Sequence, residues 1–147
     1  MLEIGAGLGV TAYYARMFGV EDYTIIDLPM TSVAHGYFLG RALGPEAICL
    51  YGEDRPGIRI WPPDSFLGGA ERYDLVVNVD SLTEMSREVA TSYCATAKSR
   101  ADTFLSINHE ANTFTSREIF ASLGLTAESR TPYWLRLGYA DEVFRMR

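Results

Sequence analysis

The feature that most constrains this chain is a set of three glycines at alternate positions, in the run Glu3-Ile-Gly-Ala-Gly-Leu-Gly9. An apolar segment precedes the glycines and an amphipathic segment follows them, which predicts a strand, a tight turn and a helix. Glycines there let the backbone bend sharply and approach a ligand closely, and the free N–H groups of the helix start suit polar ligand groups. A dinucleotide fingerprint would need a further glycine where this chain has Val10. The run therefore predicts a ligand-binding turn that departs from that fingerprint.

Short apolar runs alternate with longer amphipathic stretches along the chain, which is the pattern of a parallel sheet with crossover helices. The predicted fold class is α/β, with a Rossmann-like, mostly parallel sheet and helices on both of its faces. One domain spanning residues 1–147 is expected, because the length suits a single core. The expected strands are 2–5, 23–28, 46–51, 73–79 and 102–108, and the expected helices are 10–18, 31–43, 86–99 and 116–123.

Two stretches depart from this alternation. Residues 52–72 are rich in Pro and Gly and predict a long loop with one short strand at 58–61. Residues 125–131 and 142–147 are extended segments joined by a connection too short for a crossover helix. They predict an antiparallel hairpin at the edge of the sheet.

The composition limits the partners and the compartment. The net charge of -6 argues against nucleic acid as a partner, because affinity for phosphate backbones comes mainly from Lys and Arg. No apolar stretch approaches the roughly 20 residues that a membrane span needs. The two cysteines, Cys49 and Cys94, lie far apart in apolar runs and predict buried free thiols. A cytoplasmic protein without membrane or nucleic-acid partners is expected.

Asp27 is an acidic residue at the end of the second expected strand, which would lie beside the glycine turn. On a strand beside the turn, its carboxylate would accept two hydrogen bonds from the hydroxyls of a ligand's ribose. The alternative is that Asp27 only caps the next helix ahead of Pro29. The glycines have an alternative too, since an ordinary strand-to-helix turn needs only one.

These residues resemble a known family. The run from Glu3 to Gly9 resembles motif I of class I S-adenosylmethionine-dependent methyltransferases. The longer strings 2–15 and 23–29 resemble the sugar O-methyltransferases of bacterial glycan and natural-product pathways. Residues 37–39, 77–85 and 107–110 are also similar to that family, so the resemblance covers nearly the whole chain.

The resemblance implies S-adenosylmethionine as the cofactor and a set of residues along its length. Glu3 would help hold the methionine end, directly or through water, and Asp27 would bind the ribose. Asp64 and Ser65, after the short strand, would contact the adenine edge, with Glu53 as an alternative in a loop that is hard to align. The remaining implied contacts are Gly5, Ala6 and Gly7 along the cofactor, Leu28 against the adenine, and Asn78 and Val79 facing the methionine.

Chemistry is expected where the fourth and fifth strands end, because ligands bind beyond the carboxyl ends of such strands. His109 is the preferred general base for a hydroxyl acceptor, since imidazole titrates near neutral pH. Glu84 and Asp80 compete for that role, and His109 could instead cap the strand or orient Glu110. Carboxylates here could gather Mg²⁺, but nothing in the spacing requires a metal, so none is assigned. His35, in the second helix, is expected to be a surface or interface histidine.

The resemblance leaves the acceptor open, with a sugar or glycosylated small molecule as the expectation. Tyr133, Trp134 and Tyr139 would either form a wall against a sugar ring or pack the sheet edge. Members of the family usually carry sequence ahead of the glycine strand, and its lack here would put lid closure in doubt and favour dimerisation. The competing functions are a nicotinamide-dependent oxidoreductase and a non-catalytic Rossmann-like scaffold.

Overall fold

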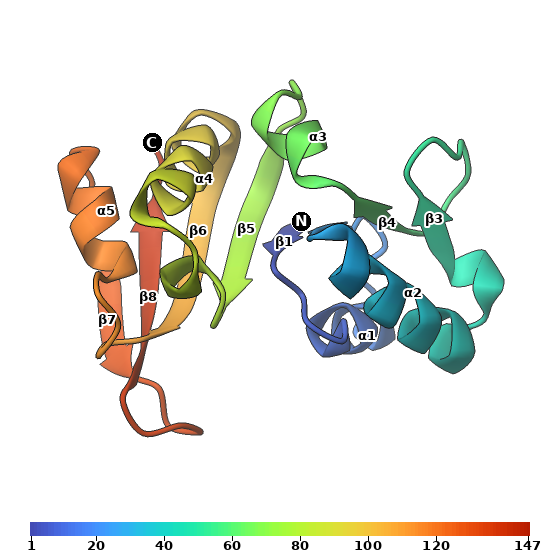
Figure 1. Cartoon of the computed structure of the whole chain (residues 1–147), viewed down its shortest axis with the longest axis horizontal. Coiled ribbons are helices and arrows are strands. Elements are labelled where there is room, and N and C mark those ends of the chain that lie inside the picture. Colours follow the sequence, from blue (N-terminus) through green and yellow to red (C-terminus); the bar gives the residue numbers. More distant parts are fainter. The chain divides into compact units, whose positions relative to one another are not determined.

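The computed structural model describes residues 1–147 and divides into two compact units, Met1–Gly69 and Ala70–Arg147 (Figure 1). In both units short strands alternate with helices along the chain. The α/β class predicted from the sequence is confirmed. No helix in the chain combines the length and the hydrophobicity that crossing a bilayer demands.

The first unit carries four parallel strands in the order β3-β4-β2-β1. Strand β2 therefore pairs with β4, the short strand expected inside the Pro- and Gly-rich stretch. Strand β3 pairs with β4 at the edge of the sheet. The strands are β1 Leu2–Ile4, β2 Thr24–Ile26, β3 Ile48–Leu50 and β4 Ile58–Trp61. The helices are α1 Val10–Met17, α2 Pro29–Leu43, a 3₁₀ turn at Pro45–Ala47, and α3 Pro63–Leu67.

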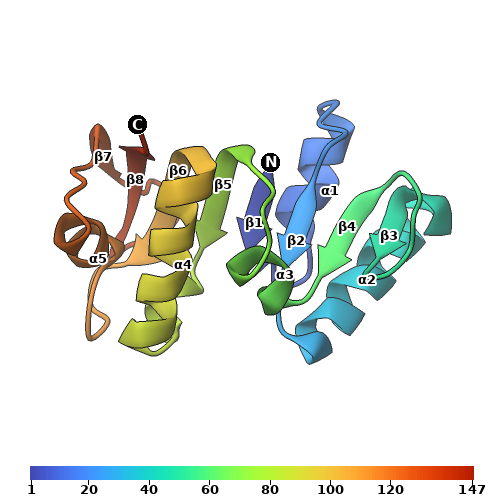
Figure 2. The same cartoon turned by 90° about the horizontal axis from the view of Figure 1, so that it is seen from above.

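Burial on both faces shapes this unit. All three residues of β1 and of β2 are buried, as expected for central strands of a parallel sheet. Helix α2 begins with Pro29 at its first position, where the missing N–H costs nothing, and it runs alongside β4 and β3 (Figures 1 and 2). The buried core cluster of the unit is Ala12, Tyr23, Ile25, Leu39 and Ile58.

The second unit carries strands in the order β5-β6-β8-β7, of which β5 and β6 are parallel and the last two pair antiparallel. The predicted C-terminal hairpin is confirmed, with β7 as the edge strand. The strands are β5 Tyr73–Val79, β6 Ala101–His109, β7 Ser129–Pro132 and β8 Tyr139–Arg145. The helices are a 3₁₀ turn at Leu82–Glu84, α4 Arg87–Arg100 and α5 Ser116–Ser122.

Side-chain caps and aromatic packing fix the elements of the second unit. Ser86 accepts a hydrogen bond from the N–H of Val89 at the start of α4, as its sequence position predicts. Three phenylalanine rings form the centre of the core. The ring centroids of Phe104 and Phe120 lie 4.9 Å apart, and those of Phe120 and Phe144 lie 4.2 Å apart. This packing attaches α5 to β6 and β8.

Three expectations need correction. The segment 52–72 contains helix α3, which starts at Pro63 directly after β4. The third expected strand is shorter than 46–51, because Pro45–Ala47 forms a 3₁₀ turn first. His35 is fully buried instead of lying at a surface. Cys49 and Cys94 are buried free thiols, as predicted.

Candidate cofactor site

The glycine turn joins β1 to α1. Two of its glycines, Gly7 and Gly9, have different surroundings. An added Cβ at Gly7, where φ is +56°, would meet no atom within 4 Å. An added Cβ at Gly9, where φ is +82°, would lie 3.0 Å from the Cβ of His35 and 3.1 Å from the Cδ1 of Leu39. Gly7 therefore leaves open space beside the backbone, whereas Gly9 allows α2 to pack closely.

Asp27 follows β2 and points at the same turn. Its Oδ2 accepts a hydrogen bond from the N–H of Ala6 at 2.9 Å, and its Oδ1 accepts one from the N–H of Leu28 at 2.7 Å. The side chain is 9% exposed. Each carboxylate oxygen has a second lone pair, so both can accept a further hydroxyl hydrogen bond. The turn and the residue after β2, to which the sequence analysis assigns ligand binding, thus lie in direct contact, and their role toward a ligand stays a prediction.

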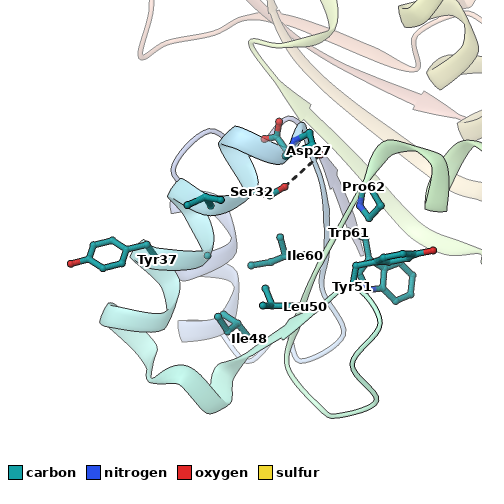
Figure 3. A pocket seen from close by; sticks show the side chains of 12 residues that line it. Asp27, Ser32, Tyr37, Ile48, Leu50, Tyr51, Ile60, Trp61 and Pro62 are labelled. Carbon is teal, nitrogen blue, oxygen red and sulfur yellow. Dashed lines mark hydrogen bonds between the residues drawn. The ribbon is translucent and has the colours of Figure 1, made fainter.

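An apolar cavity of about 600 Å³ begins at Asp27 and lies between α2 and the strands β3 and β4 (Figure 3). In Figure 3 Ile60, Leu50 and Ile48 follow one another along it from the Asp27 end, and the Tyr37 ring points away from it. Such a size and lining suit a flat or apolar organic ligand. The lining residues are Asp27, Pro29, Ser32, Val33, Gly36, Tyr37, Ile48, Leu50, Tyr51, Ile60, Trp61 and Pro62.

Sequence reasoning missed the aromatic part of this lining. The rings of Tyr51 and Trp61 meet edge to face, with centroids 6.2 Å apart. Both residues stand at or just beyond the end of a short strand, which is the one signal in the sequence that could have indicated them. Near β4, the sequence analysis assigned roles only to Asp64 and Ser65, which follow this strand.

Glu3 lies on β1 inside the unit. It is 1% exposed, and its Oε2 accepts a hydrogen bond from the Tyr23 hydroxyl at 2.8 Å. Burial raises the pKa of the Glu3 carboxyl, and the hydrogen bonds from Tyr23 and Thr11 oppose that rise. The predicted contact of Glu3 with a methionine end stays a prediction, since this carboxylate is engaged within the unit.

The residues implied to contact an adenine lie at the ends of β2 and β4. Leu28 is exposed directly after Asp27. Asp64 and Ser65 form the first turn of α3, directly after the strand that pairs with β2, and the Ser65 hydroxyl donates to the Pro62 carbonyl at 2.6 Å. Glu53 instead accepts hydrogen bonds from the Leu50 N–H and from Arg55 in the loop after β3. The strand order therefore favours Asp64 and Ser65 over Glu53.

In the second unit, the side chain of Asn78 is buried and turned into the protein. Its Oδ1 accepts hydrogen bonds from the Leu82 N–H at 3.1 Å and from Asn108 Nδ2 at 2.8 Å, and its Nδ2 donates to Ser81 Oγ at 2.5 Å. Val79 is half-buried at the last position of β5. The Asn78 amide is thus engaged within the unit, and the predicted place of Asn78 and Val79 beside a methionine stays a prediction.

Asp80 follows β5 in an unusual backbone conformation, with φ of +59°. Its two oxygens accept hydrogen bonds from Arg136 Nη1 and from the Tyr139 hydroxyl, each at 2.7 Å. The Arg136 guanidinium lies over the Tyr139 ring, 4.1 Å from its centroid. A non-glycine residue held in this region is typical of functional sites. The Asp80 carboxylate is thus held by an ion pair with Arg136 and by the Tyr139 hydroxyl, and its role as a general base stays a prediction.

His109, the predicted base, ends β6 with its ring 4.9 Å from that of Tyr139. Its Nδ1 accepts a hydrogen bond from the Ala111 N–H at 3.0 Å, so the proton of the neutral ring is on Nε2. The neutral ring thus offers a donor at Nε2, and the role of His109 as a general base stays a prediction. Glu84 is exposed at the end of the 3₁₀ turn Leu82–Glu84.

The residues considered for a cation do not assemble. Asp80 is held by Arg136 and Tyr139, while Glu110 forms an ion pair with Arg130. No group of three or more His, Cys, Asp and Glu side chains is arranged to hold a metal ion. Of the aromatic residues near the hairpin, Tyr139 packs against His109, and Trp134 is exposed.

Comparison with solved structures defines the fold. The structural neighbours include several methyltransferases, and the chain has their Rossmann-like fold. No protein-family model matches the chain, and no curated protein matches it. At the sequence identities found, the likeness concerns the fold alone.

Three solved structures illustrate the likeness, and each match covers 98% of this chain. The PH0226 protein from Pyrococcus horikoshii OT3 is 10% identical, with 80% of its length covered and a TM-score of 0.75. Magnesium protoporphyrin IX methyltransferase from Synechocystis PCC 6803, solved with bound S-adenosylmethionine, is 15% identical, with 68% covered and a TM-score of 0.69. The mitomycin 7-O-methyltransferase MmcR is 15% identical with a TM-score of 0.67, and the chain spans 48% of its length.

Proposed function

We propose that this chain binds S-adenosylmethionine and transfers its methyl group to a hydroxyl of a sugar or glycosylated small molecule. The observation that carries the proposal is the pairing of Asp27 with the glycine turn, where Asp27 Oδ2 lies 2.9 Å from the Ala6 nitrogen. When bound, the cofactor supplies a methyl group activated by a positively charged sulfur. The protein residues then serve to bind and orient it.

The residues of the first unit fit such a cofactor. Gly7 leaves open the space that a Cβ would fill, so the backbone of the turn can contact a ligand directly. Asp27 retains acceptor capacity for two ribose hydroxyls. The apolar cavity that starts at Asp27 offers Trp61 and Pro62 to the face of an adenine ring. Structures with the same fold have been solved with the cofactor bound, which adds support.

A nicotinamide-dependent oxidoreductase would use a similar strand, turn and acidic residue. The distinguishing position is Val10, the first residue of α1, where a dinucleotide fingerprint has its last glycine. That glycine allows the helix to lie close to the strand. A valine here supports the methyl donor over the dinucleotide.

The acceptor side of the proposal rests on the resemblance of the sequence to sugar O-methyltransferases. Asp80, Glu84, His109 and Tyr139 gather at the carboxyl ends of β5 and β6 in the second unit. Among them the exposed Glu84 carboxylate is favoured as the proton acceptor, because Asp80 is ion-paired with Arg136 and His109 Nδ1 accepts the Ala111 N–H. We assign Glu84 as the general base and His109 as a donor to the acceptor.

The test is incubation with methyl-labelled S-adenosylmethionine and a panel of nucleotide sugars and glycosides, with catechols and small acids as comparison acceptors. We expect label to appear in a hydroxyl-bearing glycoside. Label confined to a non-sugar acceptor would overturn the substrate class. Absence of both transfer and cofactor binding would favour the scaffold function.

A further inference from the structure

His35 contacts both halves of the cofactor site at once, and the proposed function gives it no task. From α2, its Nδ1 lies 3.3 Å from the carbonyl oxygen of Gly7 and 3.9 Å from Oδ2 of Asp27. The side chain is fully buried. One imidazole thus touches the open glycine of the turn and the carboxylate at the end of β2.

The proton on this ring can be assigned from its partners. The Gly7 carbonyl can only accept a hydrogen bond, so Nδ1 must carry the hydrogen and donate it. The other nitrogen, Nε2, is buried without any hydrogen-bond partner. Burial lowers the pKa of His35, while Asp27 acts in the opposite direction. The ring is therefore neutral at pH 7, with a single N–H.

Helix α2 packs closely against the glycine turn at His35. The third glycine of the run, Gly9, lies so close to α2 that an added Cβ would be 3.0 Å from the Cβ of His35. Close packing of α2 against the turn thus holds the imidazole beside Gly7. A buried polar side chain with one satisfied and one unsatisfied nitrogen is costly, and such groups in native proteins call for an explanation.

We propose that His35 is a positioning residue for the cofactor: its Nδ1–H fixes the Gly7 carbonyl, so that the turn keeps its open side toward the ligand. The inference rests on the proposed function, since it concerns the affinity of the same site. His35 itself touches neither the methyl group nor the acceptor in this account.

Two variants with the same number of side-chain heavy atoms separate positioning from packing. In His35→Asn the side-chain amide nitrogen can take the place of Nδ1 and donate to Gly7, whereas His35→Leu has no donor. For S-adenosylhomocysteine, measured by calorimetry, we expect the Kd to rise about 3- to 10-fold in His35→Leu, the value of one hydrogen bond, and to stay within about twofold of wild type in His35→Asn. Equal losses in both variants would show a packing role only and would overturn the inference.

A measurement on the ligand-free wild-type protein tests the geometry separately. Nitrogen-15 NMR of the histidine side chains should show His35 protonated at Nδ1 and unprotonated at Nε2. Protonation at Nε2 would overturn the inference, even if His35→Leu fails to fold. If the wild-type chain binds no S-adenosylhomocysteine, the proposed cofactor is wrong, and the protonation state of His35 still decides whether its ring donates to Gly7.

Discussion

The backbone N–H of Ala6 donates to Asp27 Oδ2 at 2.9 Å, which joins the turn after β1 to the end of β2. This bond, with the one from Leu28 N to Oδ1, fixes the carboxylate before any ligand arrives. A preorganised acceptor loses little side-chain freedom on binding, so more of the interaction free energy appears as affinity. The orientation of Asp27 is therefore central to the proposed function.

The glycines at positions 7 and 9 are predicted to respond differently to alanine. Gly7→Ala places a methyl group in open space at a positive φ, so we expect a stability loss of about 1–2 kcal/mol together with strongly weakened cofactor binding. Gly9→Ala brings its Cβ against His35 and Leu39, so we expect the larger fall in Tm. Thermal unfolding and calorimetry on the two variants check this. Equal effects on both properties would contradict the division of roles.

Because the Glu3 carboxylate is buried, we expect Glu3→Gln to stabilise the protein in a pH-dependent way. Because burial raises its pKa above the ordinary 4.5, the stability contributed by Glu3 is fully present below pH 4.5 and is lost as the pH rises through the folded-state pKa. Gln still accepts the Tyr23 hydroxyl and carries no charge. We expect Glu3→Gln to have a higher Tm than wild type at pH 8, with a gap that shrinks toward pH 4.5. A lower Tm at pH 8 would argue that the charged form is favoured.

We expect substitution of Glu84 to lower the rate of methyl transfer more than substitution of His109. Removing a general base typically costs 10²- to 10⁴-fold in rate, so Glu84→Gln should lower kcat about 100-fold or more at saturating acceptor. His109→Ala should cost less than about tenfold, because its Nδ1 lone pair is already taken by the Ala111 N–H. The rates are measured with labelled methyl donor once an acceptor is known. The reverse order of losses would restore His109 as the base.

Glu142 predicts a stability effect in the second unit. It is 1% exposed on β8, where it accepts hydrogen bonds from the Ser116 hydroxyl at 2.9 Å and from Arg130 at 3.2 Å. Glu142→Ala should cost about 1–3 kcal/mol in denaturant unfolding, because it leaves a buried hydroxyl without its acceptor. The control is Glu128→Ala, which breaks only an exposed pair with Arg145 and should cost less than about 1 kcal/mol. Similar losses would show that the buried contacts carry no extra stability.

The sequence predicts elements well where local chemistry decides them. Local signals predict the cap Ser86, the strand at Tyr73–Val79 and the short strand at Ile58–Trp61. Helix α3 was missed because Pro62 and Pro63 were interpreted only as loop residues, although Pro suits the first position of a helix.

Strand order and hydrogen bonding could not be predicted in the same way. The segments that form β3 and β4 are both short and apolar, so nothing local indicates that β4 pairs with β2. The N–H that occupies His109 Nδ1 belongs to the backbone of Ala111, which no residue pattern reveals. The burial of His35 against the glycine turn likewise depends on how closely α2 packs.

The most direct test of the account is a calorimetric titration of the wild-type chain, Asp27→Ala and the exposed control Asp54→Ala with S-adenosylhomocysteine and with NADH. We expect wild type and Asp54→Ala to bind S-adenosylhomocysteine alike and to prefer it to NADH. Asp27→Ala should bind it at least about tenfold more weakly, from the loss of hydrogen bonds to a charged group. Preference for NADH, or an affinity that Asp27→Ala leaves unchanged, would contradict the central claim.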